Sequence, residues 1–175
     1  MRRSPRPVSL ASWARCIAVT ALTVGLADFV QSFLLFSVAR HRPAIGVLQG
    51  PAAGLLGRAA MEGGTRTALL GTVLHFAIAL AWTIAFVLVW RARPPLRLHT
   101  RTWAGLLGVS AAVGVVVWLT MDWGVLRFSK AHYYPISEPY FWLLLLGHIP
   151  FVGLPLVWGV SRLAPAAGDS MSAAA

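Results

Sequence analysis

The chain has 175 residues, of which 58% are hydrophobic and only 11% are charged. Soluble domains carry about 25% charged residues, so the composition excludes an ordinary soluble domain, and its apolar content excludes a disordered chain. A single cysteine excludes a domain built on disulfides, and the formal net charge is +10. What remains is an integral membrane protein.

Four apolar segments are long enough to cross a bilayer of roughly 30 Å, which takes about 20 helical residues. They run over about 16–38, 68–90, 103–125 and 140–161. Arginines bracket the segments, as expected of side chains that reach the headgroups from helix ends. None of the segments has the two-residue alternation of β-barrel strands. We therefore predict an all-α fold, an integral membrane four-helix bundle spanning residues 16–162.

The remaining parts of the chain differ in character. Residues 1–15 are basic, and residues 163–175 are small and polar, which predicts a disordered tail. The first connection is mildly apolar but holds six glycines. We predict a short interfacial half-helix there, from about Ala52 to Met61, which could act as a lid over the bundle.

The basic residues also predict an orientation. With the N-terminus inside, nine Lys and Arg fall on the cytoplasmic side and six on the other. This favours a multi-pass protein of the bacterial inner membrane with both termini in the cytoplasm. Basic residues at the span ends meet anionic headgroups, so the expected partner is the lipid bilayer and not a nucleic acid. A homo-oligomer is left open.

Polar groups at membrane depth are costly and therefore mark a candidate site. Each span contributes at least one of them: Asp28 and Gln31, then His75, Asp122 and His148. In an up-and-down bundle the first, second and fourth spans place theirs about 10–15 Å from one membrane surface, and Asp122 about 5 Å from it. We predict a polar cluster in one half of the membrane, the outer half in the preferred orientation, with Asp122 at its rim.

Several interpretations of this cluster remain open. It could be interhelical hydrogen bonding without further function. It could bind a small ligand, a cation or a proton, with Asp28 as the charged anchor and the histidines as its partners. His75 and His148 could also ligate a metal or haem, although Cys16 lies at the other end of its span; apart from this alternative, no cofactor is expected. No catalytic motif and no metal-ligand spacing is present in the sequence, so an enzyme is not expected.

Other patterns predict packing rather than chemistry. Ser110 and Gly114 form a small-xxx-small pair, typical of close helix packing. Pro150 and its neighbouring prolines and glycines predict a kink beside His148. Trp118 and Trp123 are interpreted as anchors at the membrane interface.

One resemblance accompanies these patterns. The stretch GLLGRAAMEGGTRTALLGTVLHFAIA, the sequence LTMDW and the sequence GHIPFVGLP resemble uncharacterised bacterial inner-membrane proteins, and the later half resembles the YagU-like family. The resemblance covers roughly residues 44–162 and implies a four-helix membrane protein without implying a reaction. Proteins of this kind often carry Met-Asn where this chain has Met121 and Asp122.

Overall fold

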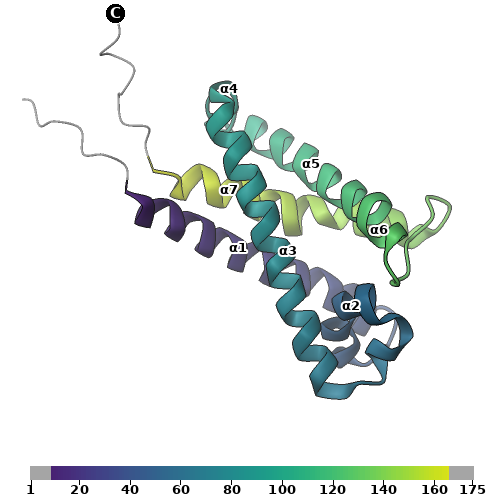
Figure 1. The fold of residues 1–175 in the computed structure, drawn as a ribbon. Helices are drawn as coiled ribbons and strands as arrows, with labels where there is room; N and C mark the ends of the chain where they lie inside the picture. Colours follow the sequence, from purple (N-terminus) through teal and green to yellow (C-terminus); the bar gives the residue numbers. More distant parts are fainter. Residues whose placement is uncertain (1–8, 166–175) are drawn as a thin grey trace, which may run out of the picture.

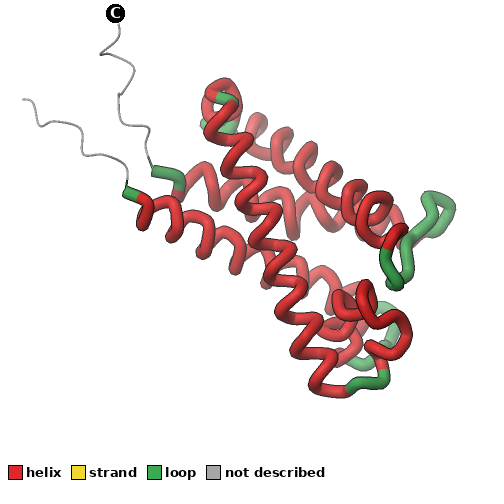
Figure 2. The backbone as a smooth tube through the Cα atoms, viewed as in Figure 1, coloured by secondary structure: helices red, strands yellow, loops and turns green. Residues whose placement is uncertain are grey.

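The structure is a computed structural model that describes residues 9–165. Residues 1–8, most of the predicted basic tail, lie outside the described residues. So do residues 166–175, which make up most of the predicted C-terminal tail. The described chain is mostly helical with short loops, and its helices run back and forth along one bundle (Figures 1 and 2).

Within the described residues, four helical stretches are long and apolar enough to cross a membrane, which confirms the predicted all-α bundle. They are Leu10–Val38, Gly64–Ala92, Trp103–Phe128 and Pro139–Leu163. The first consists of α1 (Leu10–Ser32) and the π-helix η1 (Phe33–Val38), and the second is the single helix α3 (Gly64–Ala92). The third consists of α5 (Trp103–Leu119), the π-helix η3 (Thr120–Val125) and the short 3-10 helix η4 (Leu126–Phe128). The fourth consists of α6 (Pro139–His148), the π-helix η5 (Ile149–Gly153) and α7 (Leu154–Leu163).

Two helices begin several residues before the predicted spans. The first helix begins at Leu10 rather than at residue 16, because the hydroxyl of Ser9 caps it by accepting a hydrogen bond from the Ser12 amide. Part of the predicted basic tail is therefore helical. The second helix begins at Gly64 rather than at residue 68.

The predicted half-helix is present but was placed too late in the chain. Helix α2 spans Ala44–Leu56 and is followed by the 3-10 helix η2, Gly57–Met61. The glycines of this segment led to the wrong boundary, because glycine disfavours helices. Packing compensates here, since the backbone of α2 at Leu48 lies directly against Gly71 of α3, where a Cβ atom would not fit.

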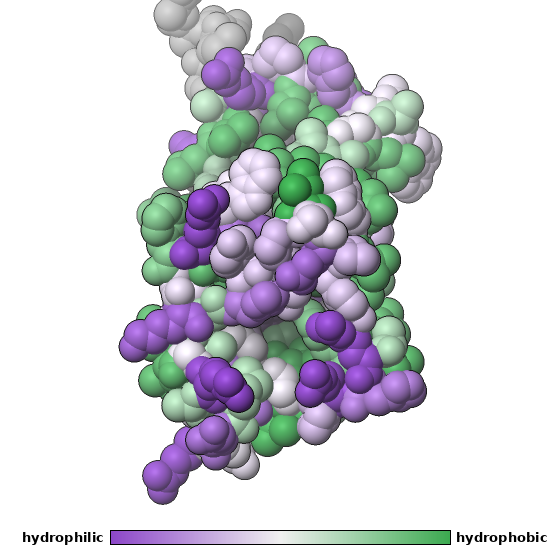
Figure 3. Space-filling view, turned by 90° about the vertical axis from the view of Figure 1, so that its right-hand side faces the viewer, coloured by the Kyte–Doolittle hydropathy of each residue, from purple (hydrophilic) through white to green (hydrophobic). Residues whose placement is uncertain are grey.

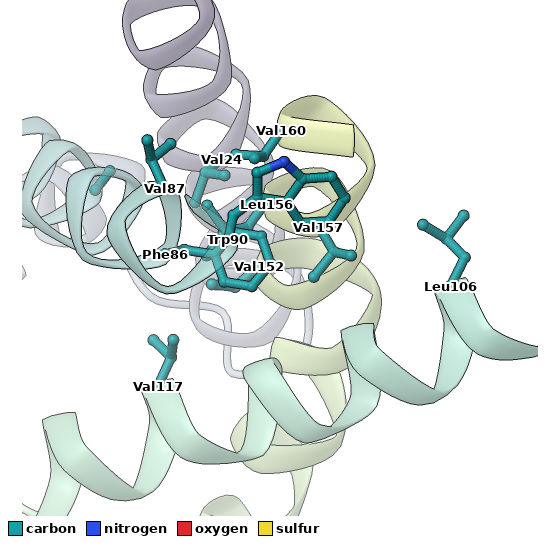
Figure 4. Packing of buried hydrophobic residues seen from close by; sticks show 11 residues of the cluster. Val24, Phe86, Val87, Trp90, Leu106, Val117, Val152, Leu156, Val157 and Val160 are labelled. Atoms are coloured by element: carbon teal, nitrogen blue, oxygen red, sulfur yellow. The ribbon is translucent and has the colours of Figure 1, made fainter. Parts of the chain in front are cut away.

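The hydrophobic core lies in the half of the bundle nearer to residues 10 and 163. Figure 4 shows side chains of α1, α3, α5, η5 and α7 meeting there; they include Val24, Phe86, Trp90, Val152, Leu156 and Val160. In the other half, α3 packs on α1 and α2, whereas α5 packs on α6 and η5. The space between these two groups of helices is where the site lies.

Small residues bring the third and fourth spans into contact. A Cβ atom on Gly114 would lie 2.6 Å from the carbonyl oxygen of His148, and one on Gly153 would meet the carbonyl oxygen of Ser110. This confirms that Ser110 and Gly114 set helix packing. The predicted disturbance of the fourth helix is also confirmed, because the π-helical segment η5 begins directly after His148 and contains Pro150.

We predict that Gly114→Ala destabilises the protein because its methyl group would overlap the fourth helix. Overpacking of this kind costs about 1–3 kcal/mol. The thermal unfolding midpoint of the protein in detergent measures the effect. Gly108→Ala is the matched control, since a Cβ atom at Gly108 of the same helix has nothing within 4 Å. Equal stability of the two variants would contradict the described packing.

Candidate functional site

A cavity of about 680 Å³ lies in the half of the bundle away from residues 10 and 163. All four spans and α2 line it. Figure 3 views the molecule toward this end and shows hydrophilic side chains gathered around a hollow. Volumes between about 300 and 1,000 Å³ are typical of sites for small molecules. Of the five predicted site residues, Asp28, His75 and His148 line the cavity, whereas Gln31 and Asp122 do not.

Asp28 and His75 face each other from α1 and α3. The Nε2 atom of His75 lies 2.9 Å from the carbonyl oxygen of Gly25, and its Nδ1 atom lies 3.9 Å from Oδ2 of Asp28. A carbonyl oxygen only accepts, so Nε2 carries a hydrogen and donates it. In the neutral ring Nδ1 then has the lone pair, and it lies on the side of the carboxylate. The ring of Phe29 stacks on His75 at 3.8 Å between centroids and holds its plane.

His148 reaches the cavity from the end of α6. Its Nδ1 atom donates to the Leu144 carbonyl oxygen at 2.7 Å, one turn earlier in the same helix. This hydrogen bond places the hydrogen on Nδ1, so Nε2 of the neutral ring is an acceptor. The indole of Trp118 packs against the imidazole with centroids 4.9 Å apart.

Gln31 holds two helices together instead of lining the cavity. Its Nε2 atom donates to the Leu144 carbonyl oxygen at 3.1 Å and lies 3.4 Å from Nδ1 of His148. The side chain is 2% exposed, and Gly147 makes room for it, because a Cβ atom there would meet its amide. Gln31 therefore supports His148 by sharing its backbone acceptor.

Asp122 is buried but serves the loop between the third and fourth spans. Its Oδ1 atom accepts a hydrogen bond of 2.9 Å from the amide of Tyr134, and its Oδ2 atom has no partner among the described residues. Asp122 thus lies outside the cavity lining, next to a residue that belongs to it. The carboxylate positions Tyr134, which does line the cavity.

Helix α2 forms one wall of the cavity. Three glycines spaced four residues apart, Gly46, Gly50 and Gly54, line the cavity along this helix. The Gln49 amide nitrogen donates to the Gly64 carbonyl oxygen and the Thr67 hydroxyl, at 3.1 Å each, and so fastens α2 to the start of α3. Since glycine has no side chain, the stripe leaves volume open inside the cavity.

The mouth of the cavity is more polar and more exposed than its interior. Arg42, His132 and Tyr134 line it, and the first two are exposed. Burial raises the pKa of the Tyr134 hydroxyl, so this group stays neutral near pH 7. The guanidinium of Arg40 lies 3.8 Å from the centroid of the Tyr140 ring and links the end of the first span to the start of α6.

The two histidines fit haem ligation unequally. Nε2 of His148 is free to act as a ligand, but both ring nitrogens of His75 are oriented by the protein, one by Gly25 and the other toward Asp28. Ligation by His75 would break the hydrogen bond to Gly25. Within residues 9–165, no group of three or more His, Cys, Asp and Glu side chains could hold a metal ion.

Three features of this site escaped the sequence analysis. Trp118 is 4% exposed and packs on His148, so its interpretation as an interface anchor is wrong, whereas Trp123 is 49% exposed. Trp82 lines the cavity from within an apolar run that gives no signal of its own. Gln49 was detectable, because it is the one polar side chain among the small and apolar residues of 44–56.

We predict that Asp122→Asn preserves the loop and that Asp122→Ala loosens it. Asparagine keeps the acceptor for the Tyr134 amide and removes a buried carboxylate oxygen that has no partner in the described structure. Alanine leaves that amide unpaired, at a cost of about 1–3 kcal/mol. Amide hydrogen exchange over residues 129–138 measures the difference. Faster exchange in the asparagine variant than in the alanine variant would contradict the assigned role.

Comparisons with known proteins identify no relative: no protein-family model matches, and neither a curated protein nor a solved structure is similar to the chain. The cavity is therefore the main indication of function. Three ionisable residues from three different spans line it: Asp28, His75 and His148.

Proposed function

We propose that this chain is a non-enzymatic membrane protein that binds a small ligand, a cation or a proton in the cavity. Asp28 is the charged anchor, and His75 is its partner. The single observation that supports this best is a cavity of about 680 Å³ that three ionisable groups line at membrane depth. Interhelical hydrogen bonding alone would leave such groups paired with each other and would need no open volume around them.

The proton is a candidate cargo because of how His75 is held. Its Nε2–H is bound by the Gly25 carbonyl, and the lone pair of Nδ1 lies 3.9 Å from the Asp28 carboxylate. Both groups are acceptors, so the pair can hold one proton between its two members. A cationic ligand would use the same carboxylate.

The location follows the charge bias of the loops. We place the protein in the bacterial inner membrane with both termini in the cytoplasm, because nine basic residues then lie inside and six outside. The cavity lies in the half of the bundle away from the described chain ends, so its mouth faces the outer side. The resemblance to the YagU-like family favours the same membrane.

We predict that a cysteine in the cavity reacts with a membrane-impermeant thiol reagent added to intact cells. Ala79→Cys is the test position, since Ala79 lines the cavity from α3. Ala77→Cys is the matched control, because Ala77 lies about 3 Å away along the same helix on a face outside the cavity and is exposed toward lipid in a membrane. A Cys16→Ala background removes the native thiol.

This experiment tests the water-accessible cavity and the orientation of the protein separately. Equal labelling of the two variants would contradict a water-accessible cavity. Labelling of the Ala79→Cys variant only after the cells are broken would keep the cavity and contradict the orientation.

The alternative function is a bis-histidine haem protein, which the free Nε2 of His148 favours and the engaged nitrogens of His75 oppose. We expect that the purified protein, expressed with haem precursor supplied, shows no Soret band. Visible absorption of the preparation is the measurement. A Soret band that disappears in both His75→Ala and His148→Ala would establish the alternative.

A further inference from the structure

The ionisable groups inside the cavity are all presented as hydrogen-bond acceptors. His148 has its hydrogen on Nδ1, bound to the Leu144 carbonyl, which leaves the lone pair on Nε2. Neutral His75 has its hydrogen on Nε2, bound to Gly25, which leaves the lone pair on Nδ1. The carboxylate of Asp28 accepts only. A ligand that satisfies these three groups must therefore donate hydrogen bonds.

Asp28 also lacks a fixed positive partner. In residues 9–165 no lysine or arginine lies within 4 Å of its carboxylate, and only His75 does, at 3.9 Å. The side chain is 24% exposed, so most of its surface is removed from water. A carboxylate in such surroundings is costly unless a cation or a proton compensates it. The missing element of the site is thus a positive charge.

The walls of the cavity suit an organic cation better than a bare ion. Phe29, Phe36, Trp82 and Trp118 line it together with aliphatic side chains. Aromatic faces attract cations and bury apolar surface at the same time. A bare metal ion would need several ligands close together, and the described residues contain no such group.

The basic residues at the mouth of the cavity oppose the binding of an organic cation only weakly. Arg42 and His132 are exposed to water, where ionic screening acts over about 8–10 Å. Asp28 lies on α1, whereas Arg42 follows η1, more than ten residues later in the chain. Among the described residues no ion pair joins the two side chains.

We infer that the cavity takes a protonated amine attached to an apolar body. The ammonium group donates to Asp28 and to Nδ1 of His75, which lie 3.9 Å apart, and the apolar part lies among the aromatic walls of the cavity that His148 also lines. This inference rests on the proposed function, because it names the ligand class of the same cavity. No covalent step is involved.

The test uses three fluorescent probes that share one apolar body. Dansylcadaverine carries a primary ammonium group, its N-acetyl derivative is neutral, and dansyl-aminohexanoic acid is an anion. The full chain is reconstituted in phosphatidylcholine nanodiscs, which have no net lipid charge to attract the cation. Binding is followed by the rise in dansyl emission, relative to empty nanodiscs.

We expect the ammonium probe to bind the natural chain at least about tenfold more tightly than the neutral probe. Asp28→Asn should remove this preference and leave the affinity for the neutral probe unchanged, which also shows that the variant is folded. Glu62→Gln is the matched control: it removes the same negative charge from an exposed residue that does not line the cavity.

Each other outcome overturns the inference. Equal binding of the ammonium and neutral probes, or a preference that Asp28→Asn leaves intact, would exclude an amine site while leaving the cavity as a ligand site. Tighter binding of the anion would assign recognition to Arg42 instead. Absence of binding by all three probes would overturn the assignment of an amine ligand. Thiol labelling of the Ala79→Cys variant would then decide whether the cavity is accessible to water at all.

Discussion

The close approach of the third and fourth spans is the constraint on which the site depends. Gly114 and Gly153 let the backbones of α5 and η5 touch at the carbonyl groups of His148 and Ser110. A larger residue at Gly114 would push away the helix that carries His148. Pro150 has no amide hydrogen, so the regular hydrogen bonding of the helix is interrupted after His148, and a π-helical turn follows. Packing and backbone chemistry therefore place this histidine before any ligand is considered.

Backbone carbonyl groups, rather than side-chain pairs, orient the polar residues of the bundle. Leu144 accepts from both His148 and Gln31, and Gly25 accepts from His75. The two bonds made by histidines fix which ring nitrogen carries a hydrogen. These hydrogen bonds to backbone carbonyl groups therefore set the tautomers of the two histidines that line the cavity. A site built in this way is organised without its ligand, which reduces the ordering cost of binding.

The sequence was sufficient for the four spans, because long apolar runs determine them. It was insufficient for the rotation of each helix about its own axis, which decides the neighbour that each side chain faces. The spans are apolar on all faces, so nothing indicated that Asp28 faces α3 while Gln31, three residues later, faces α6. The π-helical segments also escaped, since the kink at Pro150 was predicted but not its π-helical form. The role of Asp122 depends on a loop amide twelve residues away, a contact that no local pattern encodes.

Because of the glycines on α2, the volume of the cavity and its charged groups come from different helices. The groups proposed to recognise a charge, Asp28 and the histidines, lie on the spans, whereas part of the volume comes from Gly46, Gly50 and Gly54 on a helix outside them. The Cβ positions of Gly46 and Gly50 have no neighbour within 4 Å, and that of Gly54 touches only Ser129. Alanine or valine at these positions would shrink the chamber without disturbing the polar anchor. Ligand size can therefore diverge between related chains, or be engineered, while the chemistry of recognition stays the same.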